Sequence, residues 1–305
     1  MADVTTHVVS RATLVSSARH RTRNAVGLFL SLFAVCLLCA PPVSAGGCTA
    51  PVELIKLQAP LPKLLAAVRT EAPLTIVALG SSSTSGAGAS SSAHSYPARL
   101  EKELRTVWPK NAVRVINAGV GGQLARHMIV RIDKDVLSRK PQLVIWQTGV
   151  NDAIKGVPLD KFKDQLRNGM DQFRRAGVDV VLIDQQYYPS FKKLKDGPLY
   201  MAAIRDVATQ YGAPVVQRFR IMQHLIDSAQ FTTATLLSSD QFHLNDRSYD
   251  CLGHLLAQSL RSAATIVAAP VPVPGAIDKP KPVAATPPKV QPSAEMAVSK
   301  SQANM

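Results

Sequence analysis

Five short runs of β-branched and other apolar residues recur along the chain, at residues 74–79, 112–117, 142–147, 179–184 and 213–217. Each run is almost continuously apolar, which is typical of strands that are covered on both faces of a parallel sheet. Segments with helical spacing of apolar residues separate these runs, and another, rich in leucine, follows the last run. The alternation of strand and helix predicts an α/β protein, a three-layer α/β/α sandwich around a roughly five-stranded parallel sheet.

The two ends of the chain have a different composition. Residues 1–24 carry four arginines, and an apolar stretch at 25–40 is followed by small residues up to Ala45. This pattern predicts a signal peptide over residues 1–45 and export to the periplasm or the medium. The alternative is an uncleaved membrane anchor, although the apolar stretch is shorter than the roughly 18 residues that span a bilayer. Residues 269–305 are rich in proline, alanine and lysine without periodicity and predict a disordered tail, which leaves one domain at 48–268.

The net charge and the cysteines argue for some classes of function and against others. The formal net charge is +14, but the basic clusters are short and lack interleaved aromatic residues, so we expect no nucleic-acid binding and at most weak contact with anionic envelope polymers. Cys48 and Cys251 remain after removal of the signal and predict a disulfide, the alternative being lipid attachment at Cys48. The spacing of cysteine, histidine and carboxylate side chains fits no metal site, and we expect a monomer without metal or cofactor.

Polar or glycine-rich segments follow the first three predicted strands: GSSST at 80–84, AGVGGQ at 118–123 and TGVND at 148–152. Because the carboxyl ends of parallel strands meet at one edge of a sheet, these segments should lie close together. Farther along the chain, Asp240 and His243 are three residues apart, which allows the carboxylate to hold an imidazole N–H. A hydroxyl, a base, an orienting acid and N–H donors are what nucleophilic acyl transfer needs.

Taken in order, the four segments resemble the sequence blocks of the SGNH hydrolases, also called GDSL esterases and lipases, which have a flavodoxin-like fold. The resemblance implies that Ser82 is the nucleophile and that His243 is its base, oriented by Asp240. It also implies an oxyanion hole formed by the Ser82 amide, Gly122 and Asn151.

The chain departs from this family pattern at Ser81, where the family usually has aspartate, and at Ser83, where it usually has leucine. Since that aspartate is not a member of the triad, we expect altered packing of the loop and preserved chemistry. His254 is the rival to His243 because Asp250 precedes it by four residues, but such a pair inside an amphipathic helix is an ordinary surface feature.

The resemblance implies a serine esterase that hydrolyses carboxylic esters. Export suggests esters of the cell envelope, such as O-acetyl groups on polysaccharide, and the sequence shows no long apolar lid segment, which favours short acyl chains. Lysophospholipids and acyl thioesters are alternative substrates within the same family. A different class of function is a phosphate- or flavin-binding module in which the hydroxyl-rich loop cradles a phosphate. That class leaves Asn151, Asp240 and His243 without a role. A third alternative is an envelope-binding protein that uses its basic tail and only inherited the fold.

Overall fold

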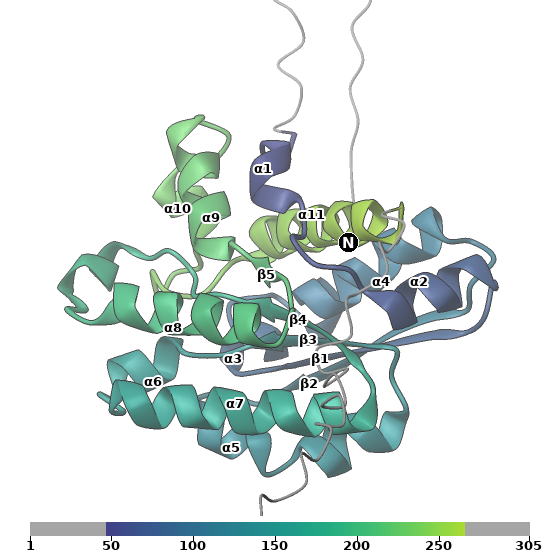
Figure 1. Cartoon of the computed structure of the whole chain (residues 1–305). Coiled ribbons are helices and arrows are strands. Elements are labelled where there is room, and N and C mark those ends of the chain that lie inside the picture. The colour runs from purple at the N-terminus through teal and green to yellow at the C-terminus, as the bar shows by residue number, and fades with distance from the viewer. Residues whose placement is uncertain (1–46, 266–305) are drawn as a thin grey trace, which may run out of the picture. The chain divides into compact units, whose positions relative to one another are not determined.

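The five predicted strands form one parallel sheet in the computed structural model, which describes residues 47–265 (Figure 1). The strands are β1 (Leu74–Gly80), β2 (Val113–Gly119), β3 (Leu143–Gln147), β4 (Asp179–Ile183) and β5 (Val215–Val216). Their order in the sheet is β2-β1-β3-β4-β5, and every neighbouring pair is parallel. The predicted fold class is therefore confirmed. The predicted signal peptide at 1–45 and tail at 269–305 lie outside the described residues.

Helices cover both faces of the sheet and bury two hydrophobic clusters against it. One face carries α1 (Val52–Ile55), α2 (Pro62–Arg69), α4 (Tyr96–Val107), α9 (Arg218–Asp227), α10 (Thr233–Leu236) and α11 (Asp246–Thr265). The other carries α5 (Ala125–Ile129), α7 (Leu159–Ala176) and α8 (Gly197–Gln210). Successive residues of β1 alternate between the clusters, since Ile76 packs in the first cluster and Val77 in the second. This arrangement explains why the strands are apolar throughout.

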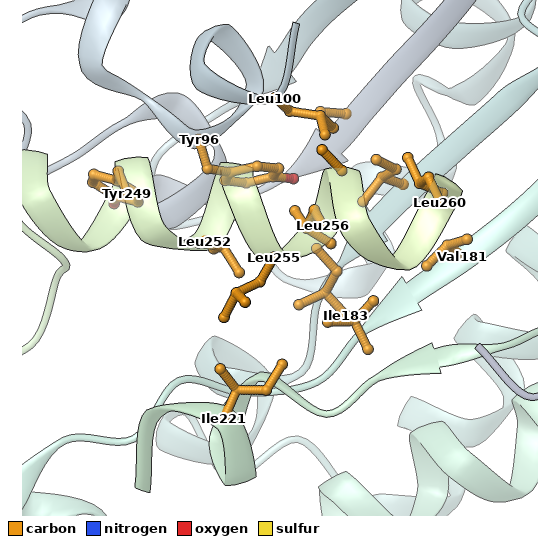
Figure 2. Close-up of a cluster of buried hydrophobic side chains, with 14 of the residues drawn as sticks. Tyr96, Leu100, Val181, Ile183, Ile221, Tyr249, Leu252, Leu255, Leu256 and Leu260 are labelled. Carbon is orange, nitrogen blue, oxygen red and sulfur yellow. The ribbon is translucent and has the colours of Figure 1, made fainter. Parts of the chain in front are cut away.

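Helix α11 provides much of the first cluster. Its leucines at 252, 255, 256 and 260 recur with helical spacing and are 5% exposed or less. Figure 2 shows these side chains gathered with Tyr96 and Leu100 of α4 and with Val181 and Ile183 of β4. Within residues 47–265, no helix combines the length and the apolar character that crossing a membrane requires.

The predicted disulfide joins Cys48 to Cys251, with 5.4 Å between the two Cα atoms. It ties the segment before α1 to the buried face of α11 across 203 residues of sequence. A sulfur that is bonded in a disulfide has no free thiol for lipid attachment, so the structure favours the bridge over the alternative at Cys48.

The order of the strands fixes where a site can form. Strand β2 pairs with one edge of β1, and the chain then crosses over so that β3 pairs with the other edge of β1. Such a reversal opens a crevice at the carboxyl ends of the two central strands. The short helices α3 (Ser82–Ser85) and α6 (Val150–Ile154) begin there, directly after β1 and close after β3.

Candidate active site

Ser82 is the first residue of α3, a single helical turn that presses against the ends of β1 and β2. The close approach depends on two glycines. A Cβ atom on Gly80 would lie 2.0 Å from the Thr84 hydroxyl oxygen, and one on Gly119 would lie 2.2 Å from the amide nitrogen of Ser85. A side chain at Gly119 would collide with the backbone of the turn, and one at Gly80 would displace the Thr84 side chain, so both glycines help to set the place of Ser82.

The side chain of Gln147, at the end of β3, is hydrogen-bonded to this turn. Its Oε1 atom accepts hydrogen bonds from the Ser81 amide at 3.2 Å, the Ser81 hydroxyl at 3.3 Å and the Thr84 hydroxyl at 3.1 Å. Gln147 and Ser81 are both buried. Ser81, which replaces the usual aspartate, therefore takes part in packing the turn that carries Ser82 against β3.

A continuous chain of hydrogen bonds joins Ser82, His243 and Asp240. The Nε2 atom of His243 is 2.7 Å from Ser82 Oγ, and its Nδ1 atom is 2.5 Å from Asp240 Oδ2. Burial favours the neutral form of Asp240, but hydrogen bonds from Ser238, His243 and Phe242 outweigh it and hold the pKa of this carboxyl well below its usual range. Because an ionised carboxylate only accepts, Nδ1 of His243 donates to Asp240 and Nε2 accepts from Ser82.

The segment that follows α3 packs directly on the loop that carries His243. Gly88 adopts a left-handed backbone with φ of +86°, and a Cβ atom there would lie 2.4 Å from the Leu244 carbonyl oxygen and 3.0 Å from His243 Cβ. The Tyr249 hydroxyl, from α11, donates to the Ala87 carbonyl oxygen at 2.7 Å. These contacts hold the loop that carries His243 and the turn that carries Ser82 together, although about 160 residues of sequence separate them.

The two other residues of the expected oxyanion hole are Gly122, in the loop after β2, and Asn151, in α6, and a hydrogen bond joins these two segments. Gly122 is exposed and has φ of +73°, and the Asn151 side-chain amide donates to the Gln123 carbonyl oxygen at 2.9 Å. Asp152 adds a second tie, because its carboxylate accepts from the Ala125 amide at 3.2 Å. Burial raises the pKa of Asp152 to about 6. Asn151 keeps a second N–H for a ligand, since its amide nitrogen carries two.

Residues 47–266 match the model of the Non-GDSL lipase-like family, a range that includes every residue that the structure describes. The chain belongs to this family. The predicted kinship with the SGNH hydrolases is thereby confirmed, and the family's description agrees with the chain's departure from the GDSL pattern at Ser81 and Ser83.

Two curated esterases are similar to parts of this chain. Esterase TesA of Pseudomonas aeruginosa is 27% identical over 143 residues, which are 47% of this chain and 66% of TesA. An acetylxylan esterase of Geobacillus stearothermophilus is 28% identical over 102 residues, 30% of this chain and 47% of that enzyme. The chain thus spans between about half and two thirds of the length of these relatives.

Among solved structures, a two-domain esterase active on acetylated mannans superposes with a TM-score of 0.59 at 19% identity. The match covers 70% of this chain and 56% of the esterase. At this level of identity the likeness is one of fold.

Sequence reasoning missed four residues that shape this site in the non-GDSL lipase-like protein: Gln147, Asp152, Ser238 and Tyr249. Asp152 and Ser238 belong to the segments that contain Asn151 and His243, but sequence reasoning assigned neither of them a role. The rival histidine has other partners: His254 lies 3.0 Å from Glu103, while Asp250 pairs with Arg99. The Ser82 hydroxyl is hydrogen-bonded to His243.

Proposed function

We propose that this non-GDSL lipase-like protein is a serine esterase that hydrolyses carboxylic esters through an acyl-enzyme. The observation that carries the proposal is the unbroken hydrogen-bond chain from Ser82 through His243 to Asp240, with distances of 2.7 and 2.5 Å. A serine hydroxyl needs such a base to become a nucleophile at neutral pH. The names of the two curated relatives, an esterase and an acetylxylan esterase, support the same chemistry.

In the acylation step, Nε2 of His243 takes the proton of Ser82 as Oγ forms a bond to the ester carbonyl carbon. The carbonyl electron pair moves onto oxygen, and the Ser82 amide, the Gly122 amide and the Asn151 side chain stabilise that charge. When the intermediate collapses, the bond to the alcohol oxygen breaks and the alkoxide takes the proton from His243. Asp240 stays ionised and stabilises the imidazolium.

Deacylation repeats these steps with water. His243 takes a proton from water, whose oxygen attacks the acyl carbon, and the carboxylic acid leaves as Ser82 regains its proton. No cofactor is needed in either half of the reaction.

The substrate is proposed to be an ester with a short acyl group, such as an O-acetyl group on envelope polysaccharide. The relative named for acetylxylan supports this substrate class. The disulfide between Cys48 and Cys251 supports export, because such bridges persist in oxidising compartments. Rates on p-nitrophenyl esters from acetate to palmitate test the acyl length, and a preference for the long esters would favour lysophospholipids or long-chain thioesters instead.

A phosphate cradle in the same loop accounts for fewer of these contacts. The amide and hydroxyl of Ser81 and the hydroxyl of Thr84 all donate to Gln147, and the amides of Thr84 and Ser85 donate to the Ser81 carbonyl oxygen. Donors that are already bonded within the turn are not free for an anion. This favours the esterase over the phosphate-binding module.

The decisive test is the variant Ser82→Ala. We expect p-nitrophenyl acetate hydrolysis to fall by on the order of 10⁶-fold, as when the nucleophile of a serine triad is removed. Labelling by a fluorophosphonate probe should disappear while the melting temperature stays close to that of the wild type. Ser91→Ala, at an exposed position in the same serine-rich segment, is the matched control and should label normally. Persistent labelling of Ser82→Ala would assign the nucleophile to another serine.

A further inference from the structure

An open groove with a volume of about 820 Å³ lies beside Asp240. Its walls come from three segments, residues 88–90, 238–240 and 245–247, with Thr235 at one end. The first segment follows the nucleophile turn, the second leads into His243, and the third opens α11. One imidazole ring and its two hydrogen bonds, of 2.7 and 2.5 Å, separate the groove wall at Asp240 from Ser82 Oγ.

The proposed chemistry determines which part of a substrate comes close to this groove. His243 must pass its proton to the oxygen of the leaving alcohol, so that oxygen lies near Nε2 when the intermediate collapses. The oxyanion points instead toward Gly122 and Asn151. The alcohol part of the ester therefore extends over the loop that carries His243. Gly88 of the groove wall packs against the same loop, because a Cβ there would come within 3.0 Å of His243 Cβ.

The walls of the groove are held in place by hydrogen bonds to carboxylate groups. The carboxylate of Asp246 accepts from the Ser90 amide at 2.7 Å and from the Ser90 hydroxyl at 2.5 Å, which fixes the first wall to α11. On the second wall, the Ser238 hydroxyl donates to Asp240 at 2.7 Å. A groove that is ordered before binding loses little conformational entropy when a ligand enters.

The lining of the groove selects the chemistry of its occupant. Hydroxyl, carboxamide, carboxylate and guanidinium groups line it, and Ala89 supplies its one aliphatic side chain. A polyhydroxylated ligand finds hydrogen-bond donors and acceptors on all three segments, and the carbon atoms between them can pack against the face of a sugar ring, whereas an alkyl chain would cover these polar groups without bonding to them. We propose that the groove binds a saccharide unit of the alcohol part of the ester. This inference rests on the proposed esterase function and adds to it the site that recognises the glycan.

Arg247 is the residue best placed to recognise such a unit. Its guanidinium lies over the Phe231 ring, 4.3 Å from the centroid, and donates to the Gln230 carbonyl oxygen at 3.3 Å. These two contacts orient the planar group, which carries five N–H donors. The other donors are not engaged by the part of the chain between residues 47 and 265. A fixed guanidinium at the groove wall can donate to sugar hydroxyls without first being ordered.

The test compares two substrates, acetylated xylo-oligosaccharide and p-nitrophenyl acetate, by the ratio of their kcat/KM values. Arg247→Ala should lower this ratio about tenfold, which corresponds to the loss of one hydrogen bond to a charged group. The change should be in KM for the saccharide ester. Ser239→Tyr, which places a large side chain in the groove from an exposed position, should lower the ratio in the same direction. The matched control is Arg261→Ala, an exposed arginine at the other end of α11, and its ratio should equal that of the wild type.

The two proposals fail in different ways. If Arg247→Ala and Ser239→Tyr both keep the wild-type ratio, the groove does not bind the saccharide, and the esterase function stands on the hydrolysis of p-nitrophenyl acetate. If the wild-type protein neither hydrolyses p-nitrophenyl acetate nor reacts with a fluorophosphonate, the esterase function itself is wrong, and the inference about the groove falls with it.

Discussion

At the scale of single residues, Asn151 has two tasks in the proposed mechanism. Its side-chain amide already donates one hydrogen bond to the Gln123 carbonyl oxygen, which fixes the loop that contains Gly122. The second N–H is the proposed donor to the oxyanion. We expect Asn151→Ala to lower kcat roughly 10²- to 10³-fold, with little change in KM, because that bond strengthens mainly in the transition state. Steady-state kinetics on p-nitrophenyl acetate measure both constants.

The neighbouring residue supplies the control. Asp152→Asn keeps an acceptor for the Ala125 amide and should leave kcat close to the wild-type value. Burial raises the pKa of Asp152 from 3.8 to about 6, so its ionisation costs folding free energy as the pH rises through that window. The asparagine variant is spared this cost, and its melting temperature should change less between pH 4 and 6. An Asn151→Ala variant with unchanged kcat would remove Asn151 from the oxyanion hole.

At the scale of elements, the end of β3 and the turn after β1 act as one unit because Gln147 accepts three hydrogen bonds from that turn. Gln147→Leu leaves these donors buried without an acceptor, at a cost of about 1–3 kcal/mol for each. A shift of the turn moves Ser82 relative to His243, so we expect fluorophosphonate labelling to slow roughly 10- to 100-fold. Labelling reactions that are quenched at successive times give the rate constant of fluorophosphonate labelling, and thermal melts measure the loss of stability.

Gln142 is a matched control at the opposite end of the same strand pair. Its Oε1 atom accepts from the Thr75 amide at 2.8 Å, so Gln142→Leu also removes a bond between β3 and β1. This variant should lose stability and keep its labelling rate. Equal slowing in both variants would mean that labelling follows overall stability, and Gln147 would then have no particular role in placing Ser82.

These examples show what the sequence can and cannot predict about such elements. The five strands were predictable because strands that are covered on both faces of a sheet are apolar at almost every position. The order of the segments around Ser82, Asn151 and His243 was also visible, since each follows a strand or precedes a helix. The role of Gln147 was not, because its partners lie more than 60 residues away and nothing in its local sequence marks them.

A similar limit applies to the N-terminus of α4. Ser95 is the N-cap residue of α4, two residues before Pro97, but its hydroxyl donates to the Ser92 carbonyl oxygen instead of accepting a hydrogen bond from the helix. A cap position can be predicted from residue type and spacing. The hydrogen-bond partner of that side chain depends on the preceding 3₁₀ turn, which supplies the carbonyl oxygen.

At the scale of the whole domain, the disulfide between Cys48 and Cys251 closes a loop of 203 residues. In the chain-entropy model, closing a loop of this length stabilises the folded state by up to about 5 kcal/mol, because it restricts the unfolded chain. We expect the double variant Cys48→Ser/Cys251→Ser to unfold at lower urea concentration by an amount that corresponds to a few kcal/mol. Urea titrations followed by circular dichroism, with and without reductant, measure this difference.

The same variant should keep the proposed esterase activity at 25 °C, because the contacts that place Tyr249 and the loop that carries His243 do not pass through the sulfur atoms. The leucine face of α11 stays buried against the sheet after the bridge is removed, and the Tyr249 hydroxyl still bonds to Ala87. The reduced wild type and the double variant should then unfold at the same urea concentration, since both lack the cross-link. If the oxidised wild type unfolds there as well, the bridge restricts the unfolded chain too little to stabilise the domain.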